Sequence, residues 1–195
     1  MELSPLARQR LEKIGKLSPE EQQKLTDERE VEDLLAPFFA GTSSADDLWQ
    51  QVKDRTEKKD PDFLRRTQNK LLDSIRLNTS DIDFKRYSDA LLGLETLKDS
   101  SSYSTIEMLL GTIASLRQRH ADVRQQAYEQ LRRQVDQQVR AQSEQARQQG
   151  LLMDTEASVE ASIKAMPEWR DFMSKQEANA SQALSDYVSR IRDVL

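Results

Sequence analysis

His120 is the only histidine in the chain, and it is the residue best suited to catalysis or to binding a metal ion. A zinc or iron site needs several converging ligands, and the chain has no cysteine to supply them. In di-metal helical bundles a glutamate three residues before the histidine also binds the metal, but Arg117 occupies that position here. We therefore interpret His120 as a structural residue on the apolar face of a helix, and we expect no metal ion and no other cofactor.

Acidic residues alternate with other residues from Asp81 to Asp89, as they do in a calcium-binding loop. An EF-hand loop needs glycine at its sixth position and glutamate at its twelfth, where this chain has Arg86 and Leu92. The sequence also contains no glycine-rich phosphate-binding loop, and His120 is the only histidine base that a nucleophilic serine could use. We therefore expect that the protein is not an enzyme.

The segment from Arg117 to Gln149 is rich in arginine and glutamine and contains no lysine. Because the arginine fork binds phosphate as readily as carboxylate, this segment indicates nucleic acid as the alternative partner. The candidate phosphate contacts are Arg117, Arg124, Arg132 and Arg140. Interleaved acidic residues, such as Asp136 four positions before Arg140, would weaken that attraction and equally indicate a solvated helix face held by ion pairs.

Two apolar clusters fall at predicted turns, where they would be available to a partner protein. The first cluster consists of Leu151, Leu152 and Met153. It lies at the predicted turn between two long helices, where it could contact a second protein or close the C-terminal cap of the preceding helix. The second cluster, Phe38 with Phe39, precedes Gly41 in a predicted loop, where the rings could form a contact patch or anchor the loop to the core.

The composition favours helix throughout the chain. Only five Gly and five Pro interrupt 195 residues, and 32% of the residues are charged. The mean hydropathy is −0.78, so the apolar core must be thin. Val, Ile and aromatic residues do not alternate with polar ones over about four to eight residues, as they would in a half-buried strand. The sequence therefore predicts an all-α fold, with more than about two thirds of the residues in helix and no β-sheet.

Helix-start signals divide the first half of the chain. Serine or aspartate marks the first turn of a helix when it stands just before a proline or shortly before acidic residues. Such signals occur at Ser4, Ser18, Ser44, Asp60 and Ser80. Because short helices are stable only when their apolar faces pack together, we expect residues 1–98 to form a small N-terminal helical cluster. The polar segment Asp99–Tyr103 marks the predicted boundary.

The second half is predicted to contain one very long helix. Ser104 and Glu107 have the spacing of a capping box, and the segment from there to Gln149 contains no Pro and a single Gly. At 1.5 Å per residue such a helix is about 65 Å long. Its predicted apolar seam consists of Ile106, Leu109, Ile113, Leu116, His120, Val123, Ala127, Leu131, Val135 and Val139.

A returning segment, Thr155–Leu195, keeps the same helical periodicity, with Thr155 as its expected cap and a start or kink at Pro167. Residues 104–195 are therefore predicted to form a long, antiparallel, coiled-coil-like helical hairpin. One partner helix would leave seam residues only partly covered, so we also expect a homodimer. The residues predicted to be partly covered are Leu131, Val135 and Val139.

These features predict a non-catalytic protein that binds another protein as an adaptor, a scaffold or a chaperone-like factor. The extended arm and the apolar clusters at turns favour this function, with nucleic acid binding as the alternative and an enzyme with an unrecognised site as a third hypothesis. No run of about 18 apolar residues is present, so we expect no membrane span. The first 16 residues contain no signal-peptide pattern and the chain has no cysteine, so we expect a cytoplasmic protein.

Overall fold

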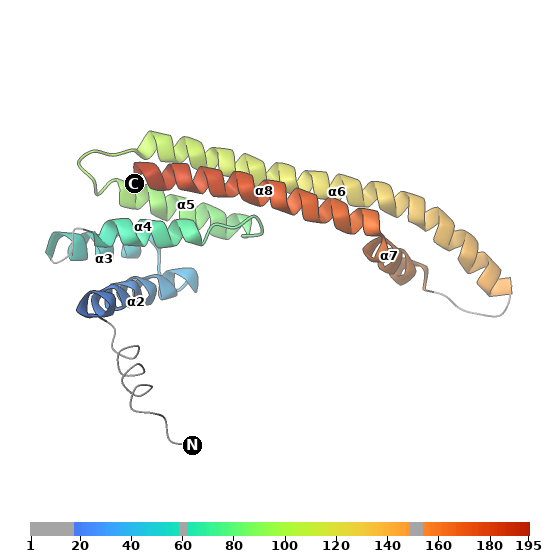
Figure 1. Ribbon diagram of the computed structural model, residues 1–195, viewed down its shortest axis with the longest axis horizontal. Helices are drawn as coiled ribbons and strands as arrows, with labels where there is room; N and C mark the ends of the chain where they lie inside the picture. The colour runs from blue at the N-terminus through green and yellow to red at the C-terminus, as the bar shows by residue number, and fades with distance from the viewer. Residues whose placement is uncertain (1–17, 59–61, 149–153) are drawn as a thin grey trace, which may run out of the picture. The chain divides into compact units, whose positions relative to one another are not determined.

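The computed structural model describes residues 18–58, 62–148 and 154–195. Within these residues the chain forms seven helices, which hold 86% of them, and no strand (Figure 1), so the all-α prediction is confirmed. None of the described helices is long and apolar enough to cross a membrane. The described residues divide into two compact units, the first built from those of 18–75 with Ser80–Tyr103 and Leu195, the second from Arg76–Thr79 and the described part of 104–194.

The first unit contains α2 (Pro19–Phe39), α3 (Ala45–Lys58), α4 (Phe63–Asp73) and α5 (Asp81–Glu95). Helix α3 contacts α2, α4 and α5, and α4 contacts α2 and α5. The buried core of this unit consists of Val31, Leu35, Phe38, Leu48, Val52, Phe63, Leu64, Leu71, Ala90 and Leu94. Every helix of the unit contributes to this list, so each one buries the apolar face that its sequence periodicity predicted.

Three of the predicted caps form as expected. The Ser18 backbone N–H donates to Glu21 (2.7 Å) and the Glu21 N–H donates back to the Ser18 hydroxyl (3.2 Å). The same reciprocal pair joins Ser44 with Asp47 (3.0 and 3.1 Å), and the backbone and side-chain hydrogen bonds from Ser44 lower the pKa of the Asp47 carboxyl. At the third cap the Asp83 N–H donates to the Ser80 hydroxyl (3.0 Å). The predicted caps at Ser4 and Asp60 lie outside the described residues.

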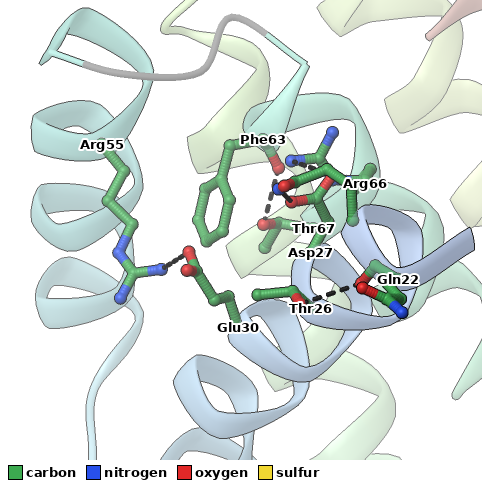
Figure 2. Close-up of polar contacts among 9 residues, drawn as sticks. Gln22, Thr26, Asp27, Glu30, Arg55, Phe63, Arg66 and Thr67 are labelled. Atoms are coloured by element: carbon green, nitrogen blue, oxygen red, sulfur yellow. Dashed lines mark hydrogen bonds and ion pairs between the residues drawn. The ribbon is translucent and has the colours of Figure 1, made fainter. Parts of the chain in front are cut away.

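Ion pairs reinforce the contact of α2 with α3 and α4. Glu30 on α2 binds Arg55 on α3 at 2.7 Å, and Arg55 also lies over the ring of Phe63 at 5.0 Å (Figure 2). Asp27 on α2 faces Arg66 on α4 at 4.0 Å. Because the Glu30 and Arg55 side chains are half exposed, their ion pair stabilises the fold by only about 0–1 kcal/mol. Burial of apolar side chains is therefore the main force that holds α2 in place.

The predicted loop at Pro37 is wrong, because α2 continues through Pro37 to Phe39. The Gly41 N–H donates to the Phe38 carbonyl (3.1 Å), and the Thr42 N–H donates to the Pro37 carbonyl (2.9 Å), so carbonyls of the last turn are satisfied after the proline. Gly41 has φ +75°, a left-handed conformation that closes helix ends. Packing of the Phe38 and Phe39 rings extends the helix beyond Pro37, where a proline would ordinarily end it.

Replacing Gly41 with alanine should lower the free energy of unfolding by about 1–2 kcal/mol, because a side chain is disfavoured at positive φ. A Cβ atom at Gly41 would also lie 3.0 Å from the Arg86 guanidinium. Thermal unfolding of the full chain measures the change as a lower Tm. Gly111→Ala is the matched control, since Gly111 lies within α6 (Tyr103–Gln148) and a Cβ there meets nothing within 4 Å. Gly111→Ala should raise the Tm. A lower Tm for both variants would contradict this explanation.

The second unit contains α6 together with α7 (Thr155–Ala165) and α8 (Pro167–Val194). Helix α6 runs unbroken for 46 residues, which at 1.5 Å per residue is about 69 Å, and the predicted long helix is confirmed. Two predicted caps are wrong, by two residues at the start of α6 and by one residue at the start of α7. Helix α6 begins at Tyr103, whose N–H donates to the Ser101 hydroxyl (3.2 Å), so Ser104 is already helical. Asp154 rather than Thr155 caps α7, because its carboxylate accepts two backbone N–H groups.

Contacts join α6 to α7 and α8 in reverse sequence order. His120 faces Glu177 at 3.6 Å, and the Tyr128 and Trp169 rings lie 5.9 Å apart. Val135 and Val139 share a small buried cluster with Val159 and Ile163 of α7, so the prediction that these two valines are only partly covered is wrong. Helix α8 lies alongside α6 (Figure 1). The returning segment breaks at Met166, which is extended (ψ 124°) before Pro167. These contacts have the order of an antiparallel pair, and a hairpin along the full length of residues 104–195 stays a prediction.

Candidate protein-interaction site

The packing face of α6 is buried on both sides of an open central stretch. Arg117 and His120 are buried before this stretch, and Val135 and Val139 are buried after it. None of residues 121–134, all of which the structure describes, is buried. On α8, likewise, none of residues 167–179 is buried. The two helices therefore face one another here over side chains that solvent still reaches.

One seam position in this stretch was predicted wrongly. Val123 is 40% exposed and does not belong to the seam. The aromatic contact with α8 comes from Tyr128, which the predicted seam did not include. Since residues four apart share a helix face, Arg124 lies on the packing stripe midway between His120 and Tyr128. The prediction sought only apolar residues, and it therefore passed over an arginine in the stripe.

A groove of about 310 Å³ lies between α6 and α8 in this stretch. Its lining consists of Ala121, Arg124, Gln125, Tyr128 and Trp169. The Trp169 ring is tilted against Tyr128 and stacks on Phe172, with centroids 5.7 Å apart and planes at 23°. All three rings are only half-buried. The groove thus has aromatic walls that a second molecule could cover further.

Arg124 is the only charged side chain that lines the groove. Its guanidinium makes no hydrogen bond or ion pair with any residue that the structure describes. The acidic residues next to it on α6 are already engaged, because Gln118 donates to Asp122 and Gln125 donates to Glu129, each at 2.8 Å. Among the described residues, the groove lining therefore presents one cation without an ion-pair partner beside aromatic rings.

The structure does not bring the four candidate phosphate-binding arginines together as a free face. Arg117 is buried and donates to the Thr79 carbonyl. Arg132 pairs with Glu156 at 2.9 Å, and Arg140 pairs with Asp136 at 2.7 Å, which is one of the ion pairs predicted from spacing. Only Arg124 remains without an internal partner among the described residues.

Phe38 is not available as a contact surface, since it is 0% exposed in the core of the first unit. Its ring lies 6.0 Å from that of Tyr87, and the Arg86 guanidinium lies over it at 5.3 Å. Phe39 is half-buried and meets Tyr87 edge-on at 5.3 Å. The core-anchoring interpretation therefore applies to Phe38, because helix α2 points its ring inward. The other predicted cluster, 151–153, lies outside the described residues.

Tyr128 and Trp169 belong to the candidate site, but the sequence did not indicate them as site residues. It also did not indicate that Arg124 lines the same groove. A signal for part of this site was present, because Trp169 and Phe172 stand three residues apart directly after Pro167 in a chain with only 6% aromatic residues. The contact with Tyr128 had no such signal. It depends on the register between α6 and α8, and no local pattern encodes that register.

No curated protein and no solved structure matches the chain. One family model matches residues 49–195, which include almost all of α3, all of α4 to α8 and every residue that lines the groove. Helix α2 precedes the matched region. Since the match covers well over half of the chain, the protein belongs to DUF6657, a family of unknown function.

Proposed function

We propose that the protein is a non-catalytic interaction module, an adaptor, scaffold or chaperone-like factor, which binds another protein at the groove between α6 and α8. The observation that carries this proposal is the composition of the groove, with Trp169, Tyr128 and Arg124 side by side. Trp, Tyr and Arg are the residues most enriched where protein–protein interfaces concentrate their binding energy. They are held here by two helices, which provide a rigid support for recognition.

The half-covered rings supply a driving force for binding. An aromatic side chain has about 150–250 Å² of surface to bury, and apolar burial contributes about 25 cal/mol per Å². At most about a third of each side chain is exposed, so covering the rest of Trp169 would contribute up to about 2 kcal/mol and covering the rest of Tyr128 somewhat less. Loss of one ring should therefore weaken a complex by up to roughly 30-fold.

The test places a photo-activated cross-linking amino acid at Gln125, an exposed residue of the groove lining, in the full chain in the cells that produce it. We expect a covalent adduct with another protein, and we expect Trp169→Ala to lower its yield by roughly 30-fold. Trp49→Ala is the matched control, since it removes a half-buried tryptophan from the first unit and should leave the yield unchanged.

The nature of the adduct decides the outcome. An adduct with nucleic acid would replace this proposal by the alternative, and an adduct between two copies of the chain would identify the groove as a homodimer contact. If the cross-linker at Gln125 gives no adduct, the groove is not an interaction site. Circular dichroism of Trp169→Ala shows whether its helices remain folded.

A further inference from the structure

We infer that the groove takes an amphipathic helix of a second protein, whose apolar stripe carries one carboxylate that pairs with Arg124. This inference rests on the proposed function and adds the kind of partner. It starts from the position of Arg124 on the packing stripe of α6, in a groove where the described chain supplies no counter-charge.

The geometry of the groove favours a helix over an extended peptide. The groove lies between two helices that run in opposite directions where His120 meets Glu177 and Tyr128 meets Trp169. Backbone N–H groups inside a helix are already bonded, so neither wall offers an edge to which a strand could add. A third helix, in contrast, packs its ridge of side chains into the furrow between two others.

The length of the open stretch sets the length of the recognition helix. The α6 residues that line the groove extend from Ala121 to Tyr128. At 1.5 Å per residue this is about 11 Å, or about two helical turns. The partner helix should therefore present apolar residues at positions i, i+3 or i+4, and i+7, with the carboxylate within this stripe.

Two buried polar residues that precede Arg124 on the α6 stripe show what Arg124 lacks. Arg117 is buried with the Thr79 carbonyl as its acceptor, and His120 is buried with Glu177 nearby. A helix that covered the groove would remove Arg124 from water in the same way. Because a buried charge is costly unless it is paired, the covering surface must bring a hydrogen-bond acceptor to this position, and a carboxylate is the acceptor that also neutralises the charge.

A carboxylate on a protein fits the surroundings of Arg124 better than a nucleic acid does. Asp122 and Glu129 lie within five residues of Arg124 on α6, and Glu177 faces the same stripe from α8. These acidic groups would repel an extended chain of phosphates. They accommodate a helix that carries a single carboxylate at the centre and neutral or basic residues on its flanks.

A second copy of this chain fits less well, for a reason of symmetry. In a two-fold dimer the same patch meets itself, so a contact through this short groove would direct the two copies of Arg124 toward each other. Like charges at such a contact are unfavourable. The partner helix is therefore assigned to a different protein.

The experiment compares charge-matched variants in the full chain that carries the cross-linker at Gln125. Arg124→Glu should lower the adduct yield at least tenfold, whereas Arg133→Glu, the same charge change on the opposite side of α6, should change it less than twofold. Arg133 is a suitable control because it is exposed and makes no ion pair with a described residue.

Sequencing the cross-linked peptide then identifies the partner segment and its carboxylate. Changing that carboxylate to arginine should restore the adduct with Arg124→Glu, which a loss of folding could not produce. Arg124→Leu provides a second measurement, because leucine fills the packing stripe and should raise the Tm while the adduct is lost.

The inference and the proposed function fail separately. If Trp169→Ala removes the adduct but Arg124→Glu leaves it intact, the groove binds a protein without the predicted carboxylate, and only the inference is overturned. A cross-linked segment without a carboxylate in a helical apolar stripe overturns it as well, as does an adduct with nucleic acid or with a second copy. If no variant gives a protein adduct, the proposed function itself is wrong.

Discussion

Phe38→Ala should lower the free energy of unfolding by about 3–5 kcal/mol, the usual effect of removing a fully buried aromatic ring from a packed core. Phe38 is 0% exposed and belongs to the core cluster shared by α2, α3, α4 and α5. Its ring also supports the Arg86 guanidinium at 5.3 Å. The substitution therefore leaves a cavity in this cluster and removes contacts that include those with Tyr87 and Arg86 on α5.

Urea unfolding measures this change through the fluorescence of Trp49, in a Trp169→Phe background where Trp49 is the only tryptophan. Phe39→Ala is the matched control, because the Phe39 ring is next in sequence but only half-buried. This variant should lose less than half as much unfolding free energy as Phe38→Ala. A change below about 0.5 kcal/mol for Phe38→Ala would be typical of a surface residue and would show that Phe38 is not part of the core.

Glu95→Ala should have an effect of similar size, about 3–5 kcal/mol, because it removes one member of a buried charged network. Glu95 is 0% exposed. Its carboxylate accepts hydrogen bonds from the Gln68 amide (2.9 Å) and the Ser102 backbone N–H (2.8 Å), and it pairs with the Lys98 ammonium at 2.8 Å. Alanine would leave the Gln68 amide and the Ser102 N–H without this acceptor in a poorly solvated site, and Lys98 would keep its hydrogen bond to the Leu195 carbonyl but lose its ion pair.

Glu30→Ala is the matched control for Glu95→Ala. Both are glutamates in the first unit with an ion pair of nearly equal length, 2.7 Å from Glu30 to Arg55 and 2.8 Å from Glu95 to Lys98. They differ in exposure, because the Glu30 side chain is 53% exposed and that of Glu95 is fully buried. Glu30→Ala should therefore cost less than about 1 kcal/mol in the same urea measurement. If the two variants lost equal amounts of unfolding free energy, burial of Glu95 would not explain the effect of Glu95→Ala.

The network around Glu95 also explains how α5 leads into α6. Ser102 lies directly before the start of α6, and its N–H is held by the last residue of α5. The predicted boundary Asp99–Tyr103 was identified from polar composition alone. The carboxylate that organises this segment lies outside it, at the end of the preceding helix.

Local features of the sequence were sufficient to predict the helices and several of their ends. The caps at Ser18, Ser44 and Ser80 were predictable because the donor and acceptor lie three residues apart. The long helix was predictable because α6 contains no Pro and only one Gly over 46 residues. Where two neighbouring residues could cap the same helix, as at Asp154 and Thr155, the choice was wrong by one position.

The tertiary structure decided which faces were buried and where a site could form. The inward position of Phe38 depends on packing among helices that are distant in the chain, and the burial of Glu95 depends on Gln68, 27 residues before it. The groove exists because α8 places Trp169 opposite Tyr128 and leaves Arg124 uncovered. Helix formation is governed by interactions within a few residues, whereas the register between two helices depends on side-chain packing along both of them. The sequence by itself therefore determined an all-α chain with one very long helix. Only the tertiary structure decided that an arginine on its packing stripe lies beside two aromatic rings with no ion-pair partner among the described residues.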